Sequence, residues 1–366
     1  MVLRYRVATA LALCGSLLLA SPSRGQESPP PVRQTGPGIQ ATRDTAYPEY
    51  VASHCKSPPV APSFGPPRPA AGPPEHRSYT VSAIPGVIAA GASWQTVWTG
   101  TGNNADGPVP TADGGMLFAQ NSDSEVMKLA ANGDVSFPYS KTNTGGALSR
   151  SKKGALFIVQ RGLPQEIWQL EPKRQRLANQ FNDEPLDCAG GVLNDLAADS
   201  RGGVYFTMGG VYHADAQGHV THYGTLTGAN GIVLSRDEQT LYVTGRLAST
   251  PADPGGPAPA GRPGGLVAYD VQHDGSLTHE RQFARVGDDG STIDAEGRIY
   301  TPGGGGVQVV GTDGKVLGEI PSPLPLITVV FGGTDKKTLY AVANNQQHVE
   351  IFRIPVIAPG YKGRPK

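Results

Sequence analysis

The sequence predicts an all-β fold, a six-bladed β-propeller, from one repeated pattern and its spacing. A turn rich in Asp, Lys and Gly, followed by an apolar–aromatic pair that opens a strand, occurs six times. The copies recur about every 40 residues, the length of a four-stranded propeller blade. Almost no helical periodicity lies between them, and six such units favour a closed ring, because an open row would leave edge strands exposed. The six recurring aromatic residues are Phe118, Phe157, Tyr205, Tyr242, Tyr300 and Tyr340.

The N-terminus is typical of a signal peptide, which we place at residues 1–25. Arg4 and Arg6 give it a positive start, residues 7–20 an apolar core and residues 21–25 a small-residue exit. The apolar run is about 14 residues long, shorter than the ~20 of a membrane-spanning helix. We therefore expect cleavage and a secreted or periplasmic protein without a membrane association, with a retained anchor as the alternative.

Residues 26–77 are dominated by Pro and carry few large apolar side chains. Such a composition buries too little apolar surface to offset the entropy of ordering, so we expect a disordered spacer that the fold can lose without cost. Cys55 lies in this stretch and Cys188 in the repeats. In an oxidising compartment the two can pair, but the sequence leaves this pairing open.

The propeller is expected over residues 78–357, followed by a tail of residues 358–366. We expect residues 86–98 to supply the strand that closes the last blade. Residues 251–263, rich in Pro and Gly, form an insertion in a loop of the fourth unit. The 31 basic and 31 acidic residues balance, so no net charge directs the protein to nucleic acid.

The innermost strand of each blade lines the central channel of a propeller, and each repeat places this strand before its turn. Counting back 11 or 12 residues from the recurring aromatics gives Asp106, Gly145 or Gly146, Asn194, Asn230, Asp289 and Thr328. Two carboxylates and two carboxamides that face one axis would repel or stay unsatisfied without a cation. Hard oxygen ligands favour Ca²⁺, with Mg²⁺, Mn²⁺ or Zn²⁺ as alternatives. The competing interpretation is a coincidence of turns, since Asp-Gly and Asn-Gly are common turn dipeptides.

These residues also carry a resemblance to the SMP-30/gluconolactonase/regucalcin-like family, over roughly residues 86–355. The stretches that resemble it are 106–109, 193–197 with 203–207, 230–232 with 235–237 and 240–243, 289–290 with 293–297, and 331–335 with 338–340. The resemblance implies a six-bladed propeller with one catalytic divalent metal, which in most members hydrolyses lactones and in some relatives phosphotriesters.

The resemblance also implies roles for single residues. Asp106, Asn230 and Asp289 are expected to bind the metal, with Asp289 also acting as the general base. Asn194 is expected to contact metal or substrate. Thr328 is expected to contact the substrate from its place at the sixth aligned channel position, apart from the resemblance. Two positions depart from the family pattern: Asp106 stands where the family usually has Glu, and Val192 where sugar-lactone members often have Arg.

The sequence thus predicts an exported, metal-dependent hydrolase that opens a lactone or similar cyclic ester. A metal bound to the carbonyl makes it more electrophilic, and Asp289 can accept a proton from the attacking water. Two alternatives remain open at this stage: a non-catalytic binding propeller with a structural metal, and a phosphotriesterase-like hydrolase.

Overall fold

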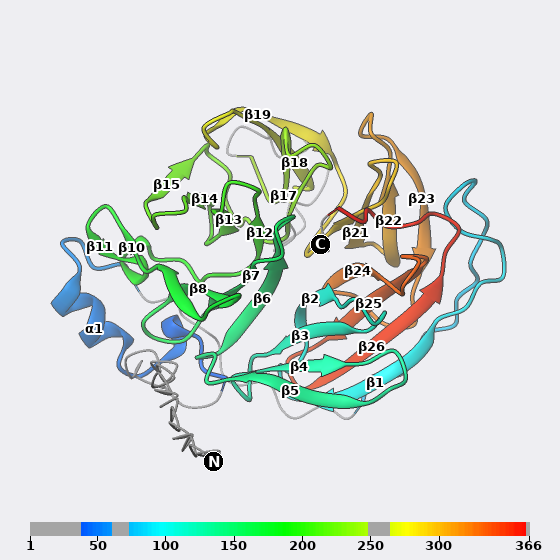
Figure 1. Cartoon of the computed structure of the whole chain (residues 1–366), viewed down its shortest axis with the longest axis horizontal. Helices are drawn as coiled ribbons and strands as arrows, with labels where there is room; N and C mark the ends of the chain where they lie inside the picture. The colour runs from blue at the N-terminus through cyan, green and yellow to red at the C-terminus, as the bar shows by residue number, and fades with distance from the viewer. Residues whose placement is uncertain (1–37, 61–72, 248–263, 364–366) are drawn as a thin grey trace, which may run out of the picture. The chain divides into compact units, whose positions relative to one another are not determined.

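The computed structural model describes residues 38–60, 73–247 and 264–363, and in them it confirms an all-β six-bladed propeller (Figure 1). Helix in this part of the chain is limited to α1 (Tyr47–His54) and two 3-10 turns, η1 (Ala41–Arg43) and η2 (Leu186–Ala189). None of these described helices is long and apolar enough to cross a bilayer. The predicted signal peptide and the predicted insertion at 251–263 lie outside the described residues.

Each blade is an antiparallel sheet of four strands, and five of the six take their strands in chain order. The first three blades are β2 (Asp106–Pro110), β3 (Met116–Gln120), β4 (Glu125–Leu129) and β5 (Val135–Ser140); β6 (Gly145–Arg150), β7 (Leu156–Gln160), β8 (Glu166–Glu171) and β9 (Gln175–Ala178); and β12 (Leu196–Ala198), β13 (Val204–Thr207), β14 (Val211–Ala214) and β15 (Val220–Tyr223). The next two are β16 (Ile232–Leu234), β17 (Thr240–Thr244), β18 (Leu266–Val271) and β19 (Leu277–Ala284); and β20 (Thr292–Ile293), β21 (Ile299–Gly303), β22 (Gly306–Val310) and β23 (Val316–Pro321). A short hairpin, β10 (Gln180–Phe181) and β11 (Glu184–Pro185), connects β9 to η2.

The last blade is closed by a strand from the beginning of the domain. It contains β24 (Thr328–Gly332), β25 (Thr338–Asn344), β26 (His348–Pro355) and, on its outer edge, β1 (Gln95–Thr101). This confirms that a segment near residues 86–98 closes the ring, with the strand itself starting at Gln95. The residues before it make a tight turn, with a bridge between Ile84 and Ile88.

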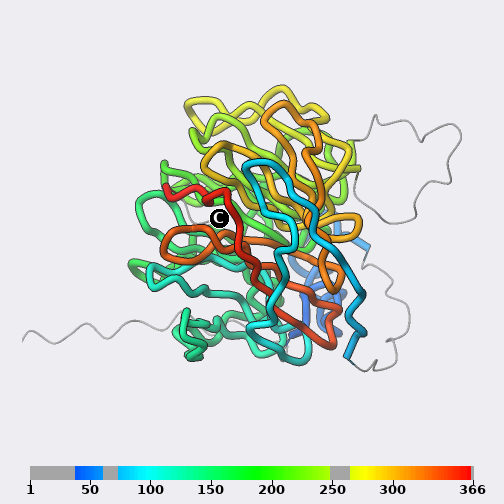
Figure 2. Tube along the Cα trace, turned by 90° about the vertical axis from the view of Figure 1, so that its right-hand side faces the viewer, coloured from blue at the N-terminus to red at the C-terminus, as the bar shows by residue number. Residues whose placement is uncertain are grey.

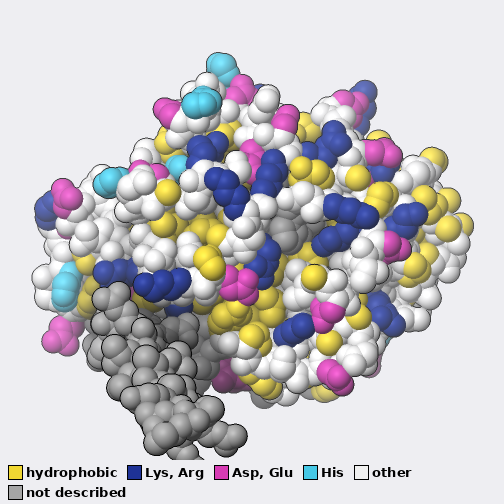
Figure 3. Space-filling view, in the orientation of Figure 1, with side chains coloured by type: hydrophobic (Ala, Val, Ile, Leu, Met, Phe, Trp, Pro, Cys, Tyr) yellow, Lys and Arg dark blue, Asp and Glu magenta, His cyan; other side chains and the backbone are white. Residues whose placement is uncertain are grey.

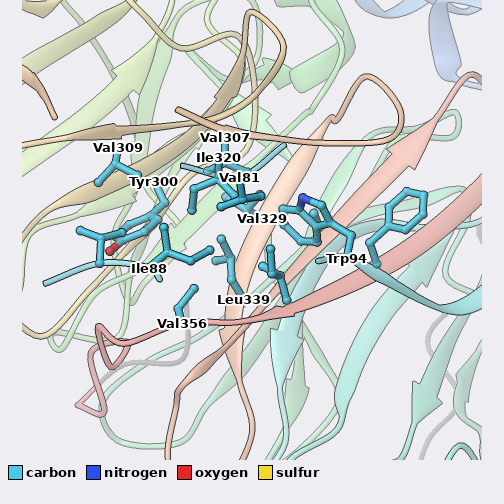
Figure 4. Close-up of a cluster of buried hydrophobic side chains, with 14 of the residues drawn as sticks. Val81, Ile88, Trp94, Tyr300, Val307, Val309, Ile320, Val329, Leu339 and Val356 are labelled. Atoms are coloured by element: carbon cyan, nitrogen blue, oxygen red, sulfur yellow. The ribbon is translucent and has the colours of Figure 1, made fainter. Parts of the chain in front are cut away.

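The hydrophobic core is divided among the contacts between neighbouring blades. Six clusters of buried side chains each join two adjacent blades, and the sixth joins the last blade to the first. Five of the six recurring aromatics are buried in these layers, while Tyr242 is half-buried. Figure 4 shows the cluster of the last two blades, where Ile88 and Trp94 pack against Tyr300 and Leu339. The aromatic repeat therefore marks the side chains that fill the spaces between blades.

Residues 38–60, here called the N-terminal arm, contradict the expected spacer. Tyr47 and Val51 of α1 are buried together with Leu163 of the second blade. A disulfide joins Cys55 to Cys188 across 133 residues, which settles the pairing that the sequence left open. The few apolar residues of this stretch thus suffice for one packed helix, because a covalent link holds it against the propeller. Residues 26–37 and 61–72 of the expected spacer lie outside the described residues.

The N-terminal arm and the C-terminal segment, residues 358–363, lie on opposite faces of the propeller (Figure 2). The arm donates from the backbone of Ala41 to the carbonyl of Arg161 at 2.7 Å, beyond the end of β7. The C-terminal segment forms a bridge between Gly360 and Asp294, beyond the end of β20. On the face shown in Figure 3, the C-terminal one, basic and acidic side chains are interspersed, in keeping with the net charge of zero.

Candidate active site in the central channel

The six positions that the sequence aligns lie at equivalent places, at the start of the innermost strand of each blade. They are Asp106, Gly145, Asn194, Asn230, Asp289 and Thr328, which begin or closely precede β2, β6, β12, β16, β20 and β24, in that order. All six therefore lie on the face that carries the N-terminal arm. The side chains of Asp106, Asn194, Asn230 and Asp289 interact with one another or through shared partners, and we call these four residues the ring.

Glycines follow three of the four ring residues, Asp106, Asn230 and Asp289, because neighbouring inner strands approach closely at these points. A Cβ on Gly107 would lie 2.1 Å from the Cα of Ala147 in the next blade, and one on Gly231 would lie 2.1 Å from the carbonyl oxygen of Asp289. Gly107 also has a φ of +44°, which side-chain-bearing residues rarely adopt. The Asp-Gly and Asn-Gly pairs thus serve close packing around the channel.

Arg161, which the sequence analysis did not single out, places a positively charged guanidinium beside the ring. It follows β7, and its side chain is only 5% exposed. Its Nη1 donates to Oδ2 of Asp106 at 2.8 Å, and its Nη2 donates to Oδ1 of Asn194 at 2.7 Å. The only available signal was the second blade, where Gly145 and Gly146 leave the aligned position without a side chain.

The two ring amides are hydrogen-bonded in series. Nδ2 of Asn194 donates to Oδ1 of Asn230, and Nδ2 of Asn230 donates to the carbonyl of Asp288 at 3.3 Å. Both amide oxygens thereby accept a hydrogen bond from within the site. The direction of each amide is fixed, because exchanging its oxygen and nitrogen would set donor against donor.

Asp289 is the ring residue whose pKa is most strongly shifted by its surroundings. Burial raises the pKa of its carboxyl well above the usual range, and the charges of Asp106 and Asp195 raise it further. The backbone N–H of Gly290, which donates to Oδ1 at 2.8 Å, and the charge of Arg161 offset only part of this effect. No described residue donates to Oδ2 of Asp289. One carboxylate oxygen and an excess of negative charge are therefore available in the channel.

Thr328 is less exposed than the four ring residues. It is 1% exposed, and its backbone forms a parallel bridge with Gly290. Its Oγ1 is buried and has no hydrogen-bond partner within the described structure. A Cβ on Gly290 would approach this oxygen to 2.4 Å, so the hydroxyl lies against the backbone that follows Asp289.

The ring suits a hard divalent cation by its donor chemistry. The described residues contain no group of three or more His, Cys, Asp or Glu side chains that could hold a metal ion, so a site built from those residue types alone is absent there. The ring instead combines two carboxylates with two carboxamides, the oxygen donors that Ca²⁺ and Mg²⁺ accept. One oxygen of Asp289 receives no hydrogen bond from a described residue, and the charges of Asp106 and Asp195 lie close enough to add to the effect of burial on its pKa, so a cation would find uncompensated negative charge here.

Comparisons with known proteins agree with this architecture. Residues 139–345 match the sequence model of the SMP-30/Gluconolactonase/LRE-like region. Lactonohydrolase oryH of Aspergillus oryzae is 32% identical over 133 residues, which cover 33% of this chain and only 28% of that protein.

Two solved structures share the fold. XC5397, a gluconolactonase from Xanthomonas campestris, aligns with a TM-score of 0.61 at 21% identity, over 79% of this chain and 98% of its own. The calcium-binding protein regucalcin from Agrobacterium tumefaciens aligns with a TM-score of 0.57 at 19% identity, over 74% of this chain and 98% of its own. At these identities the likeness concerns the fold.

Proposed function

Since the chain belongs to the SMP-30/gluconolactonase/LRE-like family, we propose that it is a divalent-metal-dependent hydrolase that opens a lactone or a similar cyclic ester. The observation that carries this proposal is the ring: two carboxylates and two carboxamides at equivalent strand starts of one channel. The names of the gluconolactonase and lactonohydrolase relatives support the same class of substrate.

Asp106, Asn230 and Asp289 are the proposed ligands of one cation, with Ca²⁺ as the first candidate. They offer oxygen donors only, and the regucalcin relative is described as calcium-binding. Asn194 lies beside them and is proposed to contact metal or substrate. The side chain of Asp106 is shorter than the Glu usual in the family. It still reaches Arg161, which also donates to Asn194.

The chemistry would divide between the cation and the protein. A bound divalent cation polarises an ester carbonyl and stabilises the negative charge that develops on its oxygen. Asp289 would accept a proton from the attacking water through Oδ2, the oxygen to which no described residue donates. Gly290 holds the other oxygen in place through its backbone N–H. Thr328, behind this turn, would contact substrate only after a shift of its surroundings, because it is almost fully buried.

We further propose that the protein acts outside the cytoplasm. Its N-terminal residues have the pattern of a signal peptide. The Cys55–Cys188 disulfide supports the same location, because disulfides persist mainly in oxidising compartments.

The test is a pH-stat screen of a lactone panel, run with metal, with chelator and after metal is added back. We expect hydrolysis that chelator abolishes and metal restores. Asp289→Asn keeps an oxygen toward the cation but cannot accept a proton, so the rate should fall about 10²- to 10⁴-fold. Asp113→Asn, in a turn at the other end of the first inner strand, should leave the rate unchanged. If the wild type binds metal and hydrolyses neither a lactone nor a phosphotriester, the protein is a binding propeller; hydrolysis of phosphotriesters alone makes it a phosphotriesterase-like hydrolase.

A further inference from the structure

The guanidinium of Arg161 has no donor left for a substrate. An arginine carries five N–H donors. Nε donates to the carbonyl of Leu193 at 2.8 Å, and Nη2 donates to both the carbonyl and the side-chain oxygen of Asn194 at 2.7 Å. Nη1 donates to Asp106 and, with the amide oxygen of Asn121 facing the guanidinium, to that oxygen at 2.8 Å. Its contribution must therefore come from its charge and from the groups it holds.

The residues around Arg161 leave room for its guanidinium. A Cβ on Gly146 would lie 2.3 Å from Nε of Arg161, so only glycine leaves room for the guanidinium. The backbone carbonyl of Arg161 accepts a hydrogen bond from the N–H of Ala41 in the N-terminal arm. The guanidinium of Arg161 thus lies between Asp106 and Asn194, where the second blade has glycine and offers no side-chain oxygen.

Arg161 also sets the direction of the amides. Because its Nη2 takes Oδ1 of Asn194, the NH₂ group of Asn194 turns to Asn230. Oδ1 of Asn230 thereby faces Asn194, while Oδ1 of Asn194 already accepts from Arg161, which competes with any contact between this oxygen and a metal ion. One oxygen of Asp106 is engaged in the same way.

We propose that Arg161 is a built-in cation of the ring, which positions Asp106, Asn194 and Asn230 and keeps the affinity for a divalent ion low. The proposal rests on the ring of the proposed function. Two effects oppose each other: the fixed amides favour metal binding, while a permanent positive charge beside Asp106 disfavours it. The charge effect dominates, because repulsion between two positive charges at short range in a partly buried site exceeds the gain from orienting neutral amide groups.

The experiment measures the affinity of the chelator-treated protein for Ca²⁺ and Mn²⁺ by isothermal titration calorimetry. Arg161→Gln should bind either ion at least about tenfold more tightly than the wild type, because the competing charge is removed. Arg161→Lys keeps the charge and should stay within about threefold of the wild type. Arg298→Gln is the matched control: it breaks a buried arginine–aspartate pair with Asp294, 2.6 Å long and outside the ring, and should leave the affinity unchanged.

Gly146→Ala provides a second route if Arg161→Gln does not fold. The new Cβ displaces the guanidinium without changing any charge, frees the oxygens of Asp106 and Asn194, and should tighten binding by a smaller factor. Unchanged or weaker metal binding in both Arg161→Gln and Gly146→Ala would overturn the proposal, as would equal tightening in Arg161→Lys and Arg161→Gln. The lactone screen reads out separately: a ring that tightens in these variants but hydrolyses nothing refutes only the proposed function.

Discussion

Asp187 is a buried carboxyl that is harder to ionise in the folded than in the unfolded protein, so the free energy of unfolding should depend on pH. It lies in η2 beside Cys188, has no exposed surface, and accepts a hydrogen bond from the backbone N–H of Gln165 at 3.1 Å. Burial raises the pKa of this carboxyl from 3.8 to about 6, and the charge of Glu166 adds to the rise. The hydrogen bond from Gln165 offsets only part of the effect. The folded protein therefore holds a proton here that the unfolded chain has already released.

The sign and size of the effect follow from this difference. Below about pH 4 both states bind the proton, and the contribution of Asp187 to the free energy of unfolding is complete. As the pH rises through about 6 the folded state must also release it, and the contribution is lost. A shift of about two pKa units corresponds to about 3 kcal/mol. Asp187→Asn cannot titrate, so this loss should be missing from its pH profile.

The assay is urea denaturation of the wild type and Asp187→Asn at several pH values between about 4 and 7. The wild type should lose about 3 kcal/mol more than the variant across this range. Asp199→Asn is the matched control, because Asp199 has no exposed surface either. Burial raises the pKa of Asp199, but the hydrogen bond with His213 and the charge of Arg201 outweigh it and hold the pKa below its usual range. Asp199→Asn should therefore lose stability at neutral pH. Parallel profiles of the wild type and Asp187→Asn would refute the reasoning.

Three further outcomes follow from the fold and the ring. Cys55→Ser opens a loop of 133 residues, so the variant should lose up to about 5 kcal/mol of unfolding free energy, and an unchanged melting temperature would show that the arm adds nothing. Asn230→Ala removes a proposed ligand, so its loss of lactone hydrolysis should be partly reversed by excess Ca²⁺ in the pH-stat assay; a loss that no metal concentration relieves would contradict a ligand role. Gly231→Ala forces a Cβ to within 2.1 Å of the carbonyl of Asp289, so it should lower both the melting temperature and metal affinity, and wild-type values of both would contradict the close packing.

The fold was largely predictable because the repeat is a packing requirement. The aromatic of each unit fills the contact between two blades, so its spacing reports blade length directly. The N-terminal arm could not be predicted in the same way. Its order depends on Cys188, far away in the sequence, and on the apolar surface around Leu163 that only the folded second blade creates. A Pro-rich composition does not reveal such distant partners.

The sequence pattern pointed to the four ring residues, but it did not reveal the positive charge of Arg161 beside them. Asp106, Asn194, Asn230 and Asp289 share one phase of the repeat, and the structure places them at equivalent strand starts. Arg161 has no such phase, since it enters from the end of a second strand and reaches the channel through the length of its side chain. Periodicity identifies residues whose backbones are equivalent, and a single long side chain that crosses between positions leaves no periodic signal.

The closure of the last blade by β1 has a consequence for how the chain folds. β1 pairs with β26, and Arg353 donates from Nε to Gln95, 258 residues earlier, at 3.2 Å. β1 therefore has no strand to pair with until nearly the whole domain has been synthesised. Contacts of such long sequence separation slow folding, because the entropy of closing the loop is lost before the contact forms. Until then β1, which is synthesised early, presents unpaired backbone groups to any neighbouring chain, and this strand is where we expect early aggregates to start.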